Sequence, residues 1–439
     1  MRTFFRILKS ASIVALGLTA GCAANRARPL NKPPKGFVAL FNGKDLAGWK
    51  GLVANPKARM EMEATELAKA QAEADEMVHE HWSVEDGILV FDGKGSHLCT
   101  TKDYRDFEMY MDWKIPRNGD SGIYLRGSPQ VQIWDPFTGT AGGHEKGSGG
   151  LYNNQKNPSA PTVCADNPIG EWNTFYMKMV GERVTVDLNG KRVVDDVVLE
   201  NYWERDRPIY PCDQIEIQAH GSVLHCRNIF LREIPRRPDA ATRQRLNAAK
   251  WRNLLGGKDL EGWEVVDGKP GAWVAEKGVL ATTGKDGGWL STDREYADFQ
   301  LEIEFRVPPG GNSGVFLRAP RSGNPAFAGM EIQILDDHAD QYANLRAYQY
   351  CGSLYATEPA RPRAAKLAGE WQKMEILCVG RRVMVRVNGA LVVDANLDDY
   401  AKMFEGHPGL RRASGYIGLQ SHGSRLEFRK IRIKDLTER

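Results

Sequence analysis

Long apolar runs and net charge are both scarce in this sequence. The apolar run at residues 11–18 is too short to cross a bilayer as a stable helix, and no other stretch could span a membrane. Lys and Arg together number 59 and Asp and Glu 56, which leaves a net charge of +3. Because no basic cluster is interleaved with aromatic residues, we expect no nucleic-acid partner.

Several catalytic and metal-binding signatures are also missing. The sequence has no HExxH, no GxSxG, no P-loop and no paired-carboxylate pattern of an ordinary glycosidase. Of seven cysteines, the six that follow Cys22 show no metal-ligand spacing, and we interpret most of them as free, buried thiols. The sequence therefore requires no cofactor, although a divalent metal such as Ca²⁺ remains an alternative. The aspartates that could supply oxygen ligands are Asp45, Asp120, Asp135, Asp336 and Asp337.

The N-terminus has the layout of an export signal. Three basic residues precede the apolar run, and Thr19-Ala20-Gly21 precede Cys22. Small residues directly before a cysteine resemble the lipobox of bacterial lipoproteins, in which that cysteine becomes the lipidated N-terminus. This pattern predicts an exported protein that is lipid-anchored to a bacterial membrane at Cys22, in the periplasm or at the outer membrane or cell surface. Ordinary cleavage near Ala20, with a free Cys22, is the alternative.

Residues 120–135 (DSGIYLRGSPQVQIWD) predict two strands joined by a tight turn. At period two, the side chains divide into a core-directed set, Ile123, Leu125, Val131 and Ile133, and an outward set, Tyr124, Arg126, Gln130 and Gln132. The same pattern recurs at residues 312–319 (NSGVFLRA) and 330–336 (MEIQILD). One face of each hairpin is therefore expected to enter a core, and the other to meet solvent or a ligand.

Other motifs repeat at a similar spacing. FEMYMDWKIP and FQLEIEFRVP begin 192 residues apart, as do the two hairpins. A period near 200 residues indicates duplicated domains rather than a solenoid. Many short strands per copy, with no βαβ alternation, predict an all-β protein of two tandem jelly-roll sandwiches. The expected segments are a signal peptide at 1–21, a tether at 22–36, domain 1 at 37–235, a linker at 236–249 and domain 2 at 250–439.

Residues 55–80 have no counterpart in the second half. They are rich in Ala, Glu, Met and Lys, which favour helices, so we expect one helix inserted between strands of domain 1. A solvated surface helix is the main interpretation. A lid over the functional face is the alternative.

A last repeated motif brings more polar side chains to the same kind of face. IEIQAHG, residues 215–221, places Glu216, Gln218 and His220 on one side, and IGLQSHG, residues 417–423, places Gln420 and His422 likewise. If these strands share a sheet with the hairpins, each domain carries a polar face that could bind a sugar and move protons. The candidate catalytic residues are His220, His422, Glu331, Arg126 and Arg318. The candidate substrate-binding residues are Tyr124, Gln130, Gln132, Tyr152, Gln218, Gln333, Tyr355 and Gln420.

Each candidate also has a structural interpretation. The two arginines could pair with Asp135 and Asp336, the glutamines could form cross-strand pairs, and a strand histidine before glycine is often only hydrogen-bonded. Glu331 aligns with Gln130. Since glutamine cannot take a proton, the two domains cannot share a mechanism that depends on Glu331.

The ordered set of motifs resembles the 3-keto-disaccharide hydrolase domain family. In the first half the resemblance is carried by SGIYLRG, QVQIWD, GGLYNN, GEWN, LNG-x-x-VVD and IEIQAHG with CRNIFLREI. In the second half it is carried by SGVFLR, EIQILD, GSLY, GEWQ, VNG-x-x-VVD and GLQSHG with FRKIRIKDL. It covers nearly everything from Phe37 to Leu436 and implies a concanavalin A-like (LamG-like) sandwich in each copy.

The resemblance implies cleavage of 3-keto-glycosides without two opposed carboxylates. A ketone at C3 acidifies the hydrogen at C2, so a base can remove that proton, the C1 oxygen leaves by β-elimination, and water adds to the enone. Strand-face reasoning gives the base to His220 or His422 with Glu331, enolate stabilisation to Arg126 or Arg318, and leaving-group assistance to Tyr152 or Tyr355. The expected partners are a carbohydrate substrate and a separate sugar C3 oxidoreductase. A non-catalytic, lectin-like tandem is the alternative, and one catalytic copy beside one binding copy is a third reading.

Overall fold

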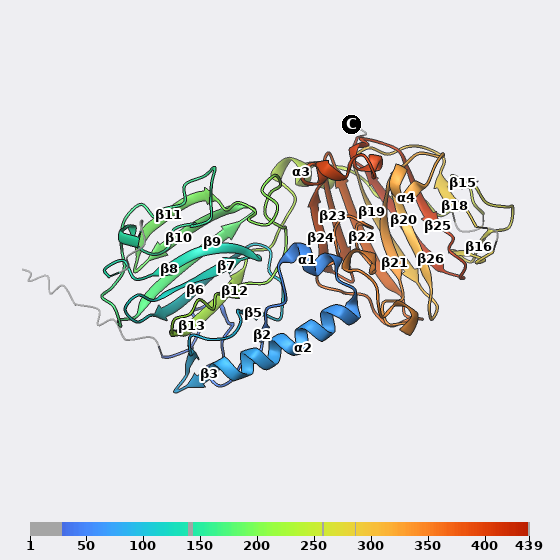
Figure 1. The fold of residues 1–439 in the computed structure, drawn as a ribbon. Coiled ribbons are helices and arrows are strands. Elements are labelled where there is room, and N and C mark those ends of the chain that lie inside the picture. Colours follow the sequence, from blue (N-terminus) through green and yellow to red (C-terminus); the bar gives the residue numbers. More distant parts are fainter. Residues whose placement is uncertain (1–28, 139–143, 257–258, 286, 438–439) are drawn as a thin grey trace, which may run out of the picture.

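The computed structural model describes residues 29–138, 144–256, 259–285 and 287–437, which fold as two β sandwiches (Figure 1). The predicted signal segment and Cys22 lie outside the described residues. No helix in the described part of the chain is long and apolar enough to cross a membrane. The six cysteines after Cys22 are free, and all except the half-buried Cys164 are buried.

Domain 1 consists of two antiparallel sheets. The eight-stranded sheet has the order β11-β10-β9-β6-β13-β4-β3, with β1 on β13, and the five-stranded sheet has the order β2-β5-β12-β7-β8. The strands are β1 Val38–Ala39, β2 Trp49–Gly51, β3 Trp82–Glu85, β4 Ile88–Phe91, β5 Leu98–Thr100, β6 Phe107–Lys114, β7 Asp120–Leu125, β8 Ser128–Trp134, β9 Asn173–Val180, β10 Arg183–Leu188, β11 Lys191–Val198, β12 Glu216–Ile217 and β13 Leu224–Glu233.

Domain 2 repeats this topology strand for strand. Its sheets have the orders β16-β17-β26-β19-β22-β23-β24, with β14 on β26, and β15-β18-β25-β20-β21. The strands are β14 Arg252–Asn253, β15 Trp263–Val266, β16 Trp273–Glu276, β17 Val279–Thr282, β18 Trp289–Thr292, β19 Phe299–Arg306, β20 Asn312–Ala319, β21 Met330–Leu335, β22 Gln372–Val379, β23 Arg382–Val387, β24 Ala390–Asn396, β25 Tyr416–Gln420 and β26 Glu427–Asp435. The predicted tandem of all-β sandwiches is confirmed.

The period-two pattern of the hairpins places their apolar side chains between the two sheets. Ile123, Leu125, Val131 and Ile133 of β7 and β8 are fully buried in the core of domain 1. Burial of each such side chain stabilises the fold by roughly 1.5–3 kcal/mol. The core fixes the register, so Tyr124, Gln130 and Gln132 lie on the opposite face of the five-stranded sheet.

The insertion contains two helices rather than the single one expected. Asn55 caps α1 (Pro56–Glu61) by accepting from the Ala58 amide at 2.9 Å, and Met62 ends that helix in extended conformation before α2 (Ala64–His81) begins. In α2 only Val78 is buried. The insertion also reaches domain 2, because the Thr65 amide donates to the Asn344 side chain at 3.0 Å. Figure 1 shows α1 between the two sandwiches and α2 running from β3 toward domain 2.

Candidate functional site

The outward face of the five-stranded sheet of domain 1 carries a pocket of about 520 Å³. Its floor is polar, with Tyr124 from β7 and Glu216 from β12, which lie opposite each other in the strand pairing. His97, directly before β5, and Trp203, from the loop ahead of β12, flank them. The remaining lining residues are Leu52, Ala54, Asn55, Gly95, Ser96 and Ala219.

Glu216 is the most unusual group in this pocket. The residue is about 1% exposed, and its Oε1 has no hydrogen-bond partner among the described residues. Arg59 Nη2, from α1, lies 4.0 Å from this oxygen and 2.6 Å from Asp213 Oδ1. Burial raises the pKa of Glu216 to about 8, with Arg59 opposing and Asp213 reinforcing the shift. Glu216 can therefore exchange a proton near neutral pH.

His97 and Tyr124 present uncharged groups beside this carboxyl. Their rings meet edge to face with centroids 5.4 Å apart. Burial, followed by the nearby His220, lowers the pKa of His97 to about 4, so its imidazole is neutral at pH 7. The Ala219 amide donates to His97 Nδ1 at 3.4 Å, which leaves Nε2 to carry the proton. Burial raises the pKa of Tyr124 to about 12, so its hydroxyl remains a donor.

The predicted glutamines extend this polar face along the sheet. Gln218 Nε2 donates to the Tyr124 hydroxyl at 3.3 Å, and its own Oε1 is buried without a hydrogen-bond partner in the described part of the chain. Gln130 donates to Gln132, and Gln132 Nε2 donates to Asp120 Oδ1 at 2.7 Å. Gln130, Gln132 and Gln218 are buried, and none of them lines the pocket.

The predicted position of Arg126 and Arg318 is wrong. Arg126, at φ 51°, lies in the two-residue turn between β7 and β8, where Leu125 pairs with Ser128. Arg318, at φ 49°, lies beside a register shift between β20 and β25. The positive φ breaks the alternation of side chains at both positions. Both side chains are buried. Arg126 Nη1 donates to the Pro211 carbonyl at 3.3 Å and lies 3.9 Å from Asp106, and Arg318 donates to the carbonyls of Ala297, Gly380 and Arg412. Neither arginine pairs with Asp135 or Asp336, the partners of the alternative interpretation.

The other candidates lie at the margin of the face or in domain 2. His220 and His422 are exposed, and His220 Nδ1 lies 3.6 Å from Asp120 Oδ2. Tyr152 is 53% exposed, with its ring 5.4 Å from that of Trp134. In domain 2, burial raises the pKa of Glu331 to about 8, and Tyr355 donates its amide to the Glu331 carbonyl. Gln333 donates to Asn312 at 3.4 Å, and Gln420 is half-buried at the end of β25.

The same face of domain 2 is closed by apolar side chains. Strand pairing aligns Trp289 with His97, Phe316 with Tyr124 and Gly418 with Glu216. Trp289 is 3% exposed and Phe316 is 2% exposed, and their rings meet edge to face at 5.5 Å. The members of this cluster are Val266, Trp289, Phe316, Ala319 and Ala326, with Phe327 and Tyr416 packed against them. Ala326 and Phe327 come from α4 (Pro325–Ala328), which fills the β20–β21 connection.

This closure predicts a stability effect at Gly418. A Cβ at that position would lie 2.2 Å from Trp289 Cε3, so Gly418→Ala should destabilise domain 2 by about 1–3 kcal/mol through overpacking. Gly406→Ala is the control, because nothing lies within 4 Å of its Cβ, and we expect a change within about 0.5 kcal/mol. Urea unfolding measures both values. Equal stability of the two variants would show that the indole can move aside.

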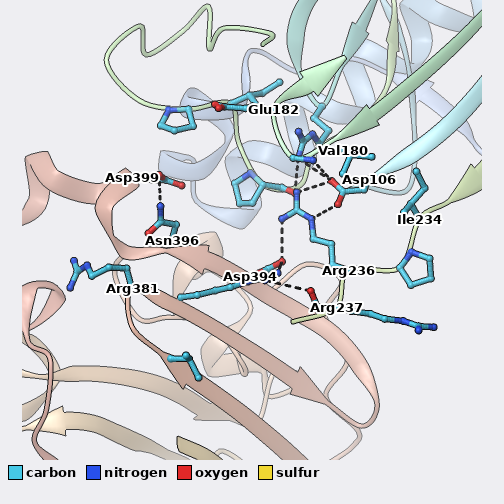
Figure 2. Close-up of a pocket in the computed structure, with 18 residues that line it drawn as sticks. Asp106, Val180, Glu182, Ile234, Arg236, Arg237, Arg381, Asp394, Asn396 and Asp399 are labelled. Carbon is cyan, nitrogen blue, oxygen red and sulfur yellow. Dashed lines mark hydrogen bonds and ion pairs between the residues drawn. The ribbon is translucent and has the colours of Figure 1, made fainter. Parts of the chain in front are cut away.

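A larger cavity, of about 720 Å³, lies between the two domains (Figure 2). Arg236 spans it, donating to Asp106 at 2.8 Å and to Asp394 at 3.2 Å, and Arg382 also binds Asp394. Burial lowers the pKa of Arg126, which also lines this cavity, to about 9. Since the charged groups here mostly neutralise one another, we assign this cavity to domain contact and place the candidate site at Glu216.

Sequence reasoning placed Glu216 on the right face without selecting it, and it missed His97 and Trp203. The usable signal was the set of positions where the repeats differ in chemistry, Glu216 against Gly418 and His97 against Trp289. No group of three or more His, Cys, Asp or Glu side chains that could hold a metal ion occurs in the described segments. The suggestion of a divalent metal stays a prediction.

Comparison with known proteins gives a family for both sandwiches. The profile of the 3-keto-alpha-glucoside-1,2-lyase-like domain matches residues 36–232 and 250–434. A 3-keto-disaccharide hydrolase of Bacteroides thetaiotaomicron is 30% identical over 224 residues, which cover 42% of this chain and 77% of that protein.

Solved structures give further matches. A protein assigned as a glycosyl hydrolase from Parabacteroides distasonis is 31% identical, with a TM-score of 0.38, over 42% of this chain and 99% of that one. The carbohydrate-binding module CBM66 of Bacillus subtilis is 15% identical, with a TM-score of 0.28, over 39% of this chain and 95% of that one. The sequence relationships support a carbohydrate-active function. Since the family profile matches in both halves and spans most of its length, the chain belongs to the 3-keto-alpha-glucoside-1,2-lyase-like domain family and carries two copies in tandem.

Proposed function

We propose that domain 1 cleaves the glycosidic bond of 3-keto-glycosides and that domain 2 has no catalytic site of this kind. The observation that carries the proposal is Glu216, a buried carboxyl with an unpartnered oxygen at the floor of a pocket. The equivalent position in domain 2 is Gly418, beneath a buried tryptophan. A difference of this kind favours one active copy over two equal ones.

The proposed reaction needs one base and hydrogen-bond donors, and the pocket contains both. Ionised Glu216 takes the proton from C2, whose electron pair is delocalised onto the C3 oxygen as an enolate. The neutral His97 Nε2–H and the Tyr124 hydroxyl are the hydrogen-bond donors available to stabilise the enolate oxygen. The proton that Glu216 has taken from C2 passes to the departing C1 oxygen, which returns Glu216 to its ionised form. As the C1–O bond breaks, a C1=C2 double bond forms. Addition of water across it, with OH at C1 and H at C2, completes hydrolysis.

The indole of Trp203 lines the same pocket and offers an apolar surface for a pyranose ring. Its Nε1 donates to the Gly127 carbonyl at 2.7 Å, which fixes the orientation of the ring.

We also propose that the protein is exported and anchored through Cys22. A separate oxidoreductase would then supply the C3 ketone.

The test uses protein without residues 1–22, incubated with a 3-keto-glucoside and with its unoxidised parent, each with and without chelator. We expect release of the aglycone from the keto form alone. Loss of that release with chelator would add a metal requirement. Binding of either sugar without turnover would contradict the enzymatic proposal and favour a lectin-like role.

A further inference from the structure

The residues around Glu216 include a buried ion cluster that crosses the domain interface. Arg59 of α1 binds one oxygen of Asp213 at 2.6 Å, and Arg361 of domain 2 binds the other at 2.8 Å. Arg361 also donates to the Cys212 carbonyl at 3.2 Å. Burial alone would raise the pKa of Asp213, but the two guanidinium groups hold this pKa below its ordinary value. Asp213 is therefore an anion held from both domains.

None of these residues is a feature common to both copies. The bridge of Tyr104 to Asp213 corresponds to that of Tyr296 to Gly415, so domain 2 has glycine in place of Asp213. The amide of Arg361 donates to Val392, as the amide of Thr162 donates to Val193, so domain 1 has threonine in place of Arg361. Arg59 lies in the insertion, which domain 2 lacks. The residues that differ between the two domains thus lie close together beside the pocket.

We propose that Arg361 of domain 2 is a positioning residue for the acid–base group of domain 1. By holding Asp213 it fixes Arg59 within 4.0 Å of Glu216 Oε1, and its charge offsets that of Asp213. Arg105 supports it from domain 1 by donating to the carbonyls of Arg361 and Val392 at 3.0 and 2.7 Å. Domain 2, whose own face is closed, thereby completes the site of its neighbour. This inference rests on the proposed function of Glu216.

Other charged groups near Glu216 belong to domain 1. Asp103 lies 3.8 Å from Arg361, and burial raises its pKa. The groups packed around the carboxyl from the other elements are Lys50 on β2, His97 and Cys99 at β5, Tyr124 on β7 and Arg59 on α1. Because Arg361 is charged and Asp213 is held as an anion, the guanidinium of Arg361 offsets a negative charge close to Glu216. Removal of Arg361 adds net negative charge and should make Glu216 harder to ionise.

The experiment compares Arg361→Gln with Arg361→Lys and Arg236→Gln in the two-domain chain, measuring kcat/KM for a 3-keto-glucoside against pH. We expect Arg361→Gln to shift the acid limb upward by about one pH unit and to lower activity at pH 7 about tenfold, with recovery at higher pH. Arg361→Lys keeps a positive charge at this position and should therefore show a smaller shift than Arg361→Gln. Arg236→Gln breaks a different interdomain ion pair and should leave the acid limb of the kcat/KM profile at the same pH as in the wild type. Unshifted limbs, or equal shifts in Arg361→Gln and Arg236→Gln, would overturn the proposal.

A direct titration separates this inference from the proposed reaction. The carboxyl of Glu216 is followed by ¹³C NMR and assigned by its disappearance in Glu216→Gln. A higher pKa in Arg361→Gln than in the wild type supports the positioning role even if no 3-keto-glycoside is cleaved. The same pKa in both proteins contradicts it whatever the substrate.

Discussion

Glu216→Gln should lower kcat/KM for a 3-keto-glucoside by a factor of about 10²–10⁴, the usual contribution of a general base. Glutamine keeps the size of the side chain, but it cannot accept the C2 proton. In the wild type the base must be ionised, and burial raises the pKa of Glu216 to about 8, so kcat/KM should increase with pH up to an apparent pKa near that value. Steady-state kinetics from pH 5 to 9 with a chromogenic 3-keto-glucoside measures both effects.

The matched variant is Glu331→Gln in domain 2. Glu331 is also buried, and burial raises its pKa to the same value, about 8, but it lies beside the closed cluster of Trp289 and Phe316. We expect Glu331→Gln to retain activity. If it abolished turnover while Glu216→Gln did not, domain 2 would be the catalytic copy and the assignment would be reversed.

The sandwich topology was predictable because it depends on local periodicity. Val131 alternates with Gln130 and Gln132 at period two, and the same alternation recurs at Ile332, between Glu331 and Gln333. The turn at Asn189-Gly190 has the two positive φ angles that its sequence predicts, 51° and 79°, and it joins β10 to β11. Such rules depend only on neighbours in the chain.

The same periodicity failed at Arg126 and Arg318. Alternation assumes an extended backbone, and a positive φ at each arginine turns the side chain away from the outward face. At Arg318 no residue type signals the bulge, since arginine rarely adopts such a φ. At Arg126 only the following Gly127 marks the two-residue turn. The arginines therefore lie buried among carbonyl groups instead of facing a ligand.

The pocket itself could be predicted only in part. Glu216 and Tyr124 follow from strand faces, but His97 precedes a short strand and Trp203 belongs to an irregular loop. Arg59 and Arg361 reach Asp213 across 154 and 148 residues of sequence. Contacts of this separation are determined by tertiary packing, which no local pattern encodes.

The two buried glutamates should also make stability depend on pH. The ordinary pKa of a glutamate is 4.5, and burial raises that of both Glu216 and Glu331 to about 8. Between these values the folded state retains a proton that the unfolded state has released. The contribution of these two protonated carboxyls to the free energy of unfolding is therefore fully present below pH 4.5. It is lost as pH rises toward 8, by up to about 1.4 kcal/mol per pH unit for each group.

Glu216→Gln and Glu331→Gln should each remove the decrease in unfolding free energy that comes from the substituted glutamate, because glutamine resembles the protonated acid and does not titrate. We expect the difference in unfolding free energy between wild type and each variant to change by roughly 2–3 kcal/mol from pH 5 to pH 7, with the variant gaining relative stability as pH rises. Urea unfolding followed by tryptophan fluorescence gives this difference. Since the two residues lie in separate sandwiches, each variant reports on its own domain. A difference that stays constant with pH for Glu216→Gln would mean that Glu216 is already ionised in the folded protein at neutral pH, and the predicted acid limb near pH 8 would then be wrong as well.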